Sequence, residues 1–91
     1  MSKLTPSQIE KALQNLPDWK LENEKLRKTY EFEDFVAAMG FVIEVAQLAE
    51  EVGHHPDIDI RYNKVILALT TRDEGGVTER DVRLAREIEE M

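Results

Sequence analysis

The sequence predicts a single α+β domain over residues 1–91, built as two layers: a four-stranded antiparallel sheet with helices on one face. Three observations support this prediction. A chain of 91 residues can form one hydrophobic core but not two. The apolar patterns follow the order helix-strand-strand-helix-strand-strand-helix. The connections within each strand pair are short enough for hairpins, which makes the paired strands antiparallel.

The first helix and the first hairpin are predicted from residues 5–32. Thr5 and Gln8 have the spacing of a capping box, and Pro6 suits the first helical position. We expect this helix to continue to Leu16, because Pro17 stops it. The hairpin that follows is predicted as a strand at 19–22, a turn at Asn23-Glu24 and a return strand at 26–32.

Residues 34–52 predict a long helix with more apolar surface than one core-facing side requires. Gly53 is a typical residue just past a helix C-terminus. The apolar residues form two stripes, Phe35, Met39, Val42, Ala46 and Ala49 in one and Phe41, Val45, Leu48 and Val52 in the other. We therefore expect this helix to pack against a second subunit as well as its own sheet, with Phe41 and Val45 in the subunit interface.

The second hairpin and the last helix are predicted from residues 57–88. Polar and apolar residues alternate from Asp57 to Tyr62, and Asn63-Lys64 is a plausible turn. The strand at 65–71 is apolar on both faces, as an inner strand would be. A loop at 73–76 then leads to a capping-box sequence at 78–81, where the final helix begins.

Composition excludes several classes of function. Twelve basic against nineteen acidic residues give a net charge of −7, so we expect no binding to nucleic acid. No apolar run approaches the roughly 20 residues of a membrane span, and we expect no membrane association. The chain has no cysteine, which excludes disulfides and thiol chemistry. The first six residues lack the apolar core of a signal peptide, so we expect a cytoplasmic protein.

The two histidines of the chain are adjacent, His54 and His55, between a glycine and a proline. Imidazole is the side chain best suited to proton transfer near neutral pH. A histidine pair at a helix C-terminus could therefore serve as a general acid and base. The structural alternative is a pair of polar residues in a connecting loop.

Two further sets of residues carry both a functional and a structural interpretation. His55, Asp57 and Asp59 could share one strand face as a metal site, although no further histidine is present to complete a zinc or iron site. The same spacing is common on solvated strand edges. Asp81 lies in the first turn of the last helix, where an acid complements the helix dipole without any role in chemistry.

The residues around the histidine pair belong to a longer set of motifs. Glu50 precedes His54-His55-Pro56 by one helical turn, and Tyr62-Asn63-Lys64-Val65 follows. Other segments of the set are Trp19, Phe32-Glu33-Asp34-Phe35, Gly40-Phe41, Thr71-Arg72-Asp73, Gly75-Gly76-Val77-Thr78, Asp81 and Leu84-Ala85. Together they span nearly the whole chain, and in this spacing they closely resemble the pterin-4a-carbinolamine dehydratase family.

The resemblance implies a hydro-lyase: loss of water from a 4a-hydroxytetrahydropterin to give quinonoid dihydropterin, which recycles tetrahydrobiopterin-type cofactors. It implies a homodimer or homotetramer and no metal or organic cofactor. By position, it assigns proton transfer to His54, with His55 and Asp81 completing the catalytic residues. It assigns pterin binding to Glu50, His55, Pro56 and Arg72.

Arg72 departs from the family pattern, which usually has a third histidine at this position, and Gly53 replaces a common aspartate. Arginine stays protonated at biological pH, so Arg72 cannot act as a general base. It could still hydrogen-bond a pterin carbonyl. Three outcomes follow: catalysis through His54 alone, use of a modified pterin, or loss of activity in a non-catalytic dimerisation or protein-binding module of the same fold.

Overall fold

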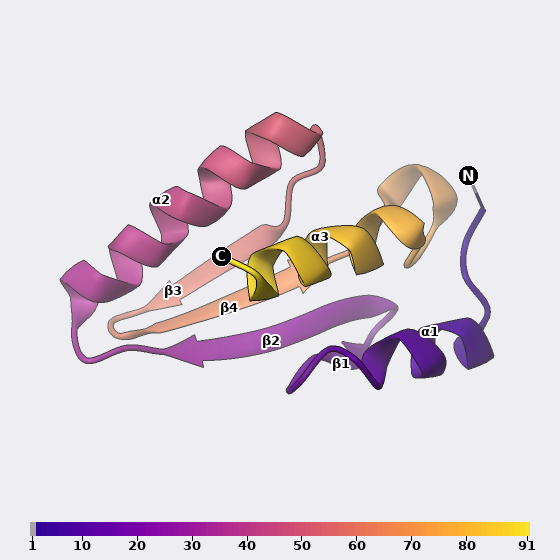
Figure 1. Cartoon of the computed structure of the whole chain (residues 1–91), viewed down its shortest axis with the longest axis horizontal. Helices are drawn as coiled ribbons and strands as arrows, with labels where there is room; N and C mark the ends of the chain where they lie inside the picture. Colours follow the sequence, from indigo (N-terminus) through magenta and orange to yellow (C-terminus); the bar gives the residue numbers. More distant parts are fainter. Residues whose placement is uncertain (1) are drawn as a thin grey trace.

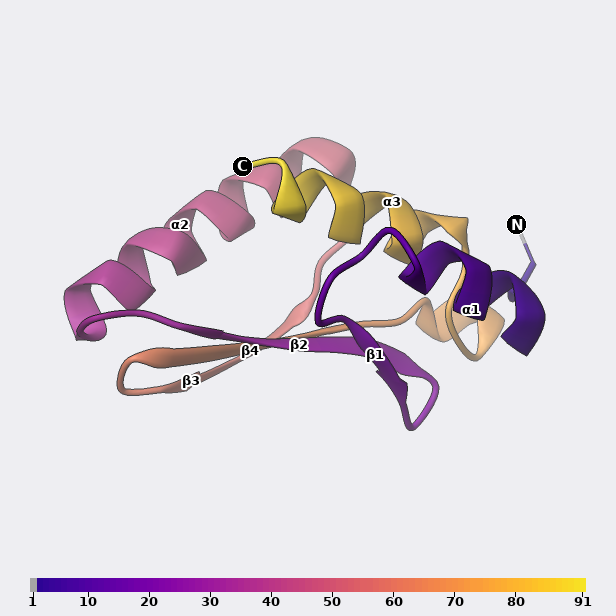
Figure 2. The same ribbon diagram turned by 60° about the horizontal axis from the view of Figure 1, so that its bottom comes forward.

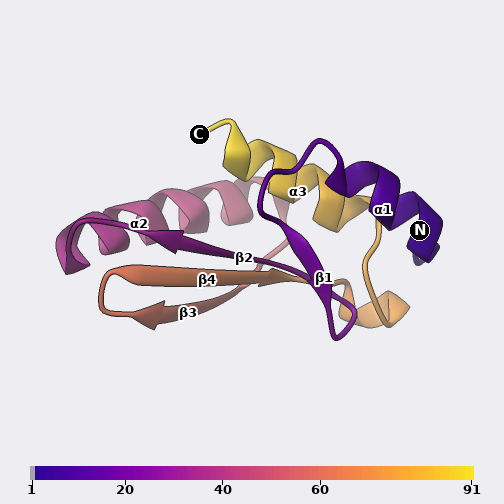
Figure 3. The same cartoon turned by 90° about the horizontal axis from the view of Figure 1, so that it is seen from below.

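Three helices cover one face of a four-stranded antiparallel sheet, as the sequence predicts (Figures 1 and 2). The computed structural model describes residues 2–91. In chain order the elements are α1 (Pro6–Leu13), β1 (Lys20–Glu22), β2 (Lys25–Glu31), α2 (Phe35–Val52), β3 (Asp57–Arg61), β4 (Lys64–Leu69), the 3₁₀ turn η1 (Arg72–Glu74) and α3 (Glu79–Glu89). The face of the sheet opposite the helices is open (Figure 3).

The strand order in the sheet is β1-β2-β4-β3, which makes β4 an inner strand as expected. The two hairpins join through β2 and β4, where Leu26 pairs with Leu69 and Glu31 with Lys64. Val65, Leu67 and Leu69 are buried beneath the helices, whereas Ile66 and Ala68 point to the open face and are partly exposed. The core therefore lies between β2 and β4 on one side and the helices on the other.

Two predicted boundaries are wrong. The first helix ends at Leu13, because the backbone N–H groups of the next residues, including Leu16, bond to the carbonyl three residues back. This tighter turn carries Leu16 and Trp19 into the core. The second hairpin turns at Tyr62-Asn63, one residue earlier than predicted, with Tyr62 in the left-handed region at φ 55°.

The helix ends confirm the capping residues and set the position of the later site. Gly53 adopts φ 69° and ends α2, and the backbone N–H of His54 still bonds to the carbonyl oxygen of Ala49 at 3.2 Å. Thr78 and Asp81 form the capping box of α3. His54 is thus fixed at the C-terminus of α2, next to the N-terminus of α3.

The packing of α2 differs from the prediction for its interface residues. Val45 is fully buried, and the Phe41 ring lies 4.5 Å from that of Tyr30 between ring centroids. Val45 is therefore closed to a second subunit and its assignment to an interface is wrong, whereas Phe41 is partly buried and packs against the core. The large apolar residues of α2 that are exposed are instead Val36, at 78 %, and Ile43, at 56 %, together with Phe35 and Val52 at its two ends. Within residues 2–91, no helix has the length and hydropathy needed to cross a bilayer.

Candidate active site

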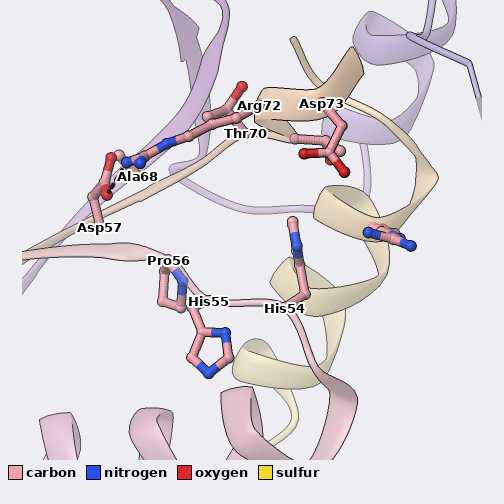
Figure 4. Close-up of a pocket in the computed structure, with 10 residues that line it drawn as sticks. His54, His55, Pro56, Asp57, Ala68, Thr70, Arg72 and Asp73 are labelled. Atoms are coloured by element: carbon pink, nitrogen blue, oxygen red, sulfur yellow. Dashed lines mark hydrogen bonds and ion pairs between the residues drawn. The ribbon is translucent and has the colours of Figure 1, made fainter. Parts of the chain in front are cut away.

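A polar cavity of about 290 Å³ opens where α2, β3, the end of β4 and α3 meet. His54, His55 and Pro56 form one wall from the chain between α2 and β3 (Figure 4). Residues 70–73 form the opposite wall, beyond the end of β4. The cavity therefore joins the predicted histidine pair to the segment that contains Arg72.

His54 forms a close pair with a buried carboxylate. Its Nε2 lies 2.6 Å from Oδ1 of Asp81, a side chain with no exposed surface. The other carboxylate oxygen of Asp81 accepts a hydrogen bond from the Thr71 hydroxyl and one from the Thr78 backbone N–H, each at 2.8 Å. Asp81 does not line the cavity itself, but it contacts two residues that do, His54 and Thr71.

The threonine hydroxyls fix the direction of this network. The Thr71 hydroxyl donates to Asp81, so its contact of 2.8 Å with Thr78 Oγ1 has Thr78 as the donor. Thr78 Oγ1 in turn accepts from the backbone N–H of Arg80 at 3.3 Å. No buried polar side-chain atom among residues 2–91 lacks a partner. Asp81 is consequently held as an acceptor, with a fixed orientation toward His54.

His55 faces the solvent and pairs with Glu50. Its Nε2 lies 2.5 Å from Oε2 of Glu50, and both side chains are more than half exposed. Glu50 does not line the cavity, so its link to the site runs through His55. An exposed pair of this kind contributes little to stability.

Arg72 is held across the cavity mouth by Asp57. Its Nη2 donates to Oδ1 of Asp57 at 3.1 Å (Figure 4). Oδ2 of the same carboxylate accepts from Lys25 Nζ at 3.2 Å. The ion pair occupies only one side of the guanidinium, whose planar group carries five N–H donors. The remaining donors of Arg72 are available to a ligand.

The predicted metal-site residues do not come together. Asp57 pairs with Arg72 and Lys25, Asp59 with Arg61, and His55 with Glu50. Within the part of the chain that the structure describes, no three His, Cys, Asp or Glu side chains form a group that could hold a metal ion.

Two further residues contribute to the site without a role predicted from the sequence, although Thr71 belongs to the Thr71-Arg72-Asp73 motif. Arg80 lines the cavity, and none of the ion pairs of residues 2–91 uses its guanidinium. Thr71 supports Asp81 from the loop side. The sequence signal for Thr71 is its place in the Thr71-Arg72-Asp73 motif, and the signal for Arg80 is its place beside Asp81 in the capping-box sequence 78–81.

Comparisons with known proteins agree with this arrangement. The family model described as pterin 4 alpha carbinolamine dehydratase matches residues 2–91. A relative from Acidobacterium capsulatum is 58 % identical over 91 residues, covering 100 % of this chain and 99 % of its own. A relative from Chloroflexus aurantiacus is 53 % identical, covering 100 % and 98 %. Both are named pterin-4-alpha-carbinolamine dehydratases on a provisional basis.

Solved structures show the same fold. The crystal structure of a Brucella melitensis protein described as a transcriptional coactivator/pterin dehydratase has a TM-score of 0.92 and 36 % identity, covering 98 % of this chain and 97 % of its own. A pterin dehydratase-like RuBisCO assembly factor of the alpha-carboxysome shares the fold alone, with a TM-score of 0.68 and 24 % identity over 80 % of this chain and 87 % of its own. The whole-chain match and these identities show that the chain belongs to the pterin-4a-carbinolamine dehydratase family.

Proposed function

We propose that this protein dehydrates a 4a-hydroxytetrahydropterin to the quinonoid dihydropterin, in support of pterin-cofactor recycling. The observation that carries the proposal is the His54–Asp81 pair, with 2.6 Å between Nε2 and Oδ1, at the wall of the polar cavity. The reaction needs groups that exchange protons near neutral pH in an environment where their orientation is fixed. His54 meets both requirements.

Asp81 selects the tautomer of His54. The carboxylate accepts a hydrogen bond from Nε2–H of His54, so the lone pair of the imidazole lies on Nδ1. In the proposed reaction Nδ1 takes the proton from N5 of the pterin as the C4a–O bond breaks and the C4a=N5 double bond forms. The departing hydroxyl takes up a proton from solvent in the open cavity and leaves as water, and His54 afterwards releases the proton from N5 to solvent. The imidazolium that forms on His54 is stabilised by the adjacent carboxylate.

The other predicted residues act on the pterin ring rather than on the proton. His55 and Pro56 line the same wall of the cavity as His54. Glu50 orients His55 through their hydrogen bond. Arg72, held by Asp57, directs its remaining donors at the polar edge of the ring, and the ring's carbonyl oxygen is a suitable acceptor.

The test is a stopped-flow assay on freshly generated 4a-hydroxytetrahydropterin. His54→Ala is expected to lower turnover by at least about a hundredfold with the fold intact. Arg72→His restores the usual family residue and serves as the comparison, while Asp59→Asn, at an exposed residue outside the cavity, is the matched control. An inactive wild type that becomes active as Arg72→His would overturn the assignment and favour a binding module.

An exposed apolar strip on α2 favours association as a second property of the same domain. Val36 and Ile43 lie on the side of α2 that faces away from the core, and they are 78 % and 56 % exposed. Gly40 lies between them, and a Cβ there would meet no atom of the subunit. A glycine inside an exposed helix costs about 1 kcal/mol relative to alanine, so the subunit itself gains nothing from it. We propose that this strip packs on a second copy in a homodimer or homotetramer.

Sedimentation velocity at micromolar concentration tests the association. Ile43→Asp is expected to shift the protein to a smaller species, because it buries a charge in an apolar contact. Glu44→Gln, at the next exposed residue, is the control and should leave the assembly unchanged. A wild type that sediments as a monomer would remove the proposed interface.

A further inference from the structure

The His54 side chain borders two cavities, so packing alone does not fix the orientation of its ring. It lines the first cavity, and it also lines a second cavity of about 470 Å³ between the end of α2 and α3. Among residues 2–91, the ring of His54 makes one hydrogen bond, the bond of 2.6 Å to Oδ1 of Asp81. The orientation of His54 therefore depends on how firmly Asp81 itself is held.

Two groups hold the other carboxylate oxygen of Asp81. One is the backbone N–H of Thr78 at 2.8 Å, which belongs to the capping box of α3 and is present wherever this helix begins in the same way. The second is the hydroxyl of Thr71, also at 2.8 Å, which comes from the loop after β4. Thr71 is thus the support of Asp81 that lies outside α3 and its cap.

The hydroxyl of Thr71 serves the Asp81 network rather than its own loop. Thr71 precedes the 3₁₀ turn η1 at the N-cap position, but its side chain makes no capping hydrogen bond there. Its backbone closes the loop without the hydroxyl, since its N–H donates to the Gly76 carbonyl oxygen at 2.9 Å and its carbonyl oxygen accepts from the Gly76 N–H at 3.3 Å. The side chain is only 5 % exposed, and its hydroxyl accepts from Thr78 and donates to Asp81.

Resting on the function proposed above, we infer that Thr71 is a positioning residue for the dehydration. Its hydroxyl holds the Asp81 carboxylate in the rotation that presents Oδ1 to Nε2 of His54, and it thereby aims Nδ1 of His54 at the substrate. Without the hydroxyl, the buried carboxylate loses one of its three hydrogen bonds and is free to turn about its axis. A displacement of a reacting group by about 1 Å lowers a rate by as much as about a hundredfold.

The first experiment compares two variants of Thr71 in the stopped-flow assay. Thr71→Val keeps the shape of the side chain without its hydroxyl. It is expected to lower kcat by at least about tenfold and to change KM by less than about twofold, because the hydroxyl acts on His54 through Asp81 and not on substrate binding. Thr71→Ser restores the hydroxyl and should recover most of the lost kcat. Equal losses in the two variants would overturn the role of the hydroxyl.

Thr29→Val is the matched control for this comparison. It makes the same exchange at an exposed residue of β2 that lines neither of the two cavities, so kcat should equal that of wild type. Circular dichroism verifies that each variant is folded. If Thr71→Val does not fold, Thr71→Ala removes the hydroxyl without placing a methyl group beside Asp81, and the same results are expected of it.

The second experiment reads the position of His54 without turnover. In a proton NMR spectrum, an imidazole N–H that donates to a carboxylate gives a separate signal at low field. The chain has two histidines, so the spectrum of His55→Gln assigns the signal of His54. This signal should be present in wild type and in Thr71→Ser, and it should be lost by exchange with water in Thr71→Val.

The outcomes of the two experiments separate this inference from the proposed function. Thr71→Val that keeps either the low-field signal or the kcat of wild type would overturn the positioning role and leave the proposed function intact. A wild type that shows the signal but dehydrates no 4a-hydroxytetrahydropterin would overturn the proposed function. In that case, loss of the signal in Thr71→Val would still support the positioning of His54 by Thr71.

Discussion

The two ends of α3 each carry a carboxylate that accepts three hydrogen bonds, yet the two have different roles. Near the N-terminal end, Asp81 accepts from His54, Thr71 and the Thr78 backbone. Near the C-terminal end, one oxygen of Glu89 accepts from Trp19, Lys28 and Tyr30. The number of bonds to a carboxylate thus says little about its function.

The difference lies in the donors and in access. The donors to Glu89 keep their protons at neutral pH, and burial together with the neighbouring carboxylate raises the pKa of Tyr30 further. None of the cavities described above is lined by Glu89. His54, in contrast, lines both cavities, and imidazole is the side chain best suited to proton transfer. We therefore propose that the Asp81 end carries the chemistry and that the Glu89 end stabilises the fold.

The largest expected effect is a difference in turnover between variants of the two carboxylates, Asp81 and Glu89. Asp81→Asn replaces the acceptor of His54 with an amide and is expected to lower turnover about a hundredfold or more, since the proton-bearing nitrogen of His54 is no longer fixed. Glu89→Gln should leave turnover of the folded protein unchanged. The measurement is the stopped-flow assay, with circular dichroism to verify that both variants are folded. Equal losses in the two variants would contradict the comparison.

The next effect concerns stability. Glu89→Gln is expected to lower the free energy of unfolding by about 1–3 kcal/mol, because the charge-assisted bonds from Lys28 and Tyr30 are weakened. Urea denaturation at pH 7 measures the change. Glu90→Gln, at the exposed neighbouring residue, is the matched control and should change stability by less than about 0.5 kcal/mol.

The smallest expected effect is the pH dependence of the difference in free energy of unfolding between wild type and Glu89→Gln. Partial burial acts to raise the pKa of Glu89, but the hydrogen bonds from Lys28, Tyr30 and Trp19 outweigh it and lower the pKa. A carboxyl group whose pKa is lower in the folded state stabilises the fold above its unfolded pKa of about 4.3, and the contribution is lost as the pH falls through the folded value. The stability gap between wild type and Glu89→Gln should therefore be complete at pH 7 and shrink below about pH 4. A gap that is constant down to pH 3 would exclude an ionic origin.

Local sequence signals predicted most of the fold. The capping residues Thr5, Thr78 and Asp81 and the helix end at Gly53 were confirmed because each acts within one helical turn. The end of α1 and the turn at Tyr62 were misplaced because packing of Leu16 and the twist of the hairpin decide them. The exposed face of α2 was assigned to the wrong residues for the same reason, since helical spacing alone does not say which stripe meets the sheet.

The site was less predictable than the fold. His54 and Asp81 were singled out separately, but 27 positions separate them, and their contact depends on where α2 ends relative to α3. The roles of Thr71 and Arg80 have no local pattern, because a threonine after a strand and an arginine in a first helical turn are common on protein surfaces. The charge of Arg72 was evident, whereas its ion pair with Asp57 requires the register of β3 against β4.

Every residue that lines the first cavity lies between His54 and Arg80, so the N-terminal third of the chain supplies scaffold but no part of that cavity. That scaffold still reaches the cavity through one turn. The turn at Asn23-Glu24 is exposed, and both of its residues have positive φ, as a tight two-residue hairpin turn requires. The carbonyl oxygen of Glu24 accepts a hydrogen bond at 3.1 Å from the hydroxyl of Thr70, a residue that lines the cavity, and the next residue, Lys25, donates to Asp57. Exposed turns are the positions where proteins accept inserted peptides, but a tag in this turn would loosen one wall of the cavity.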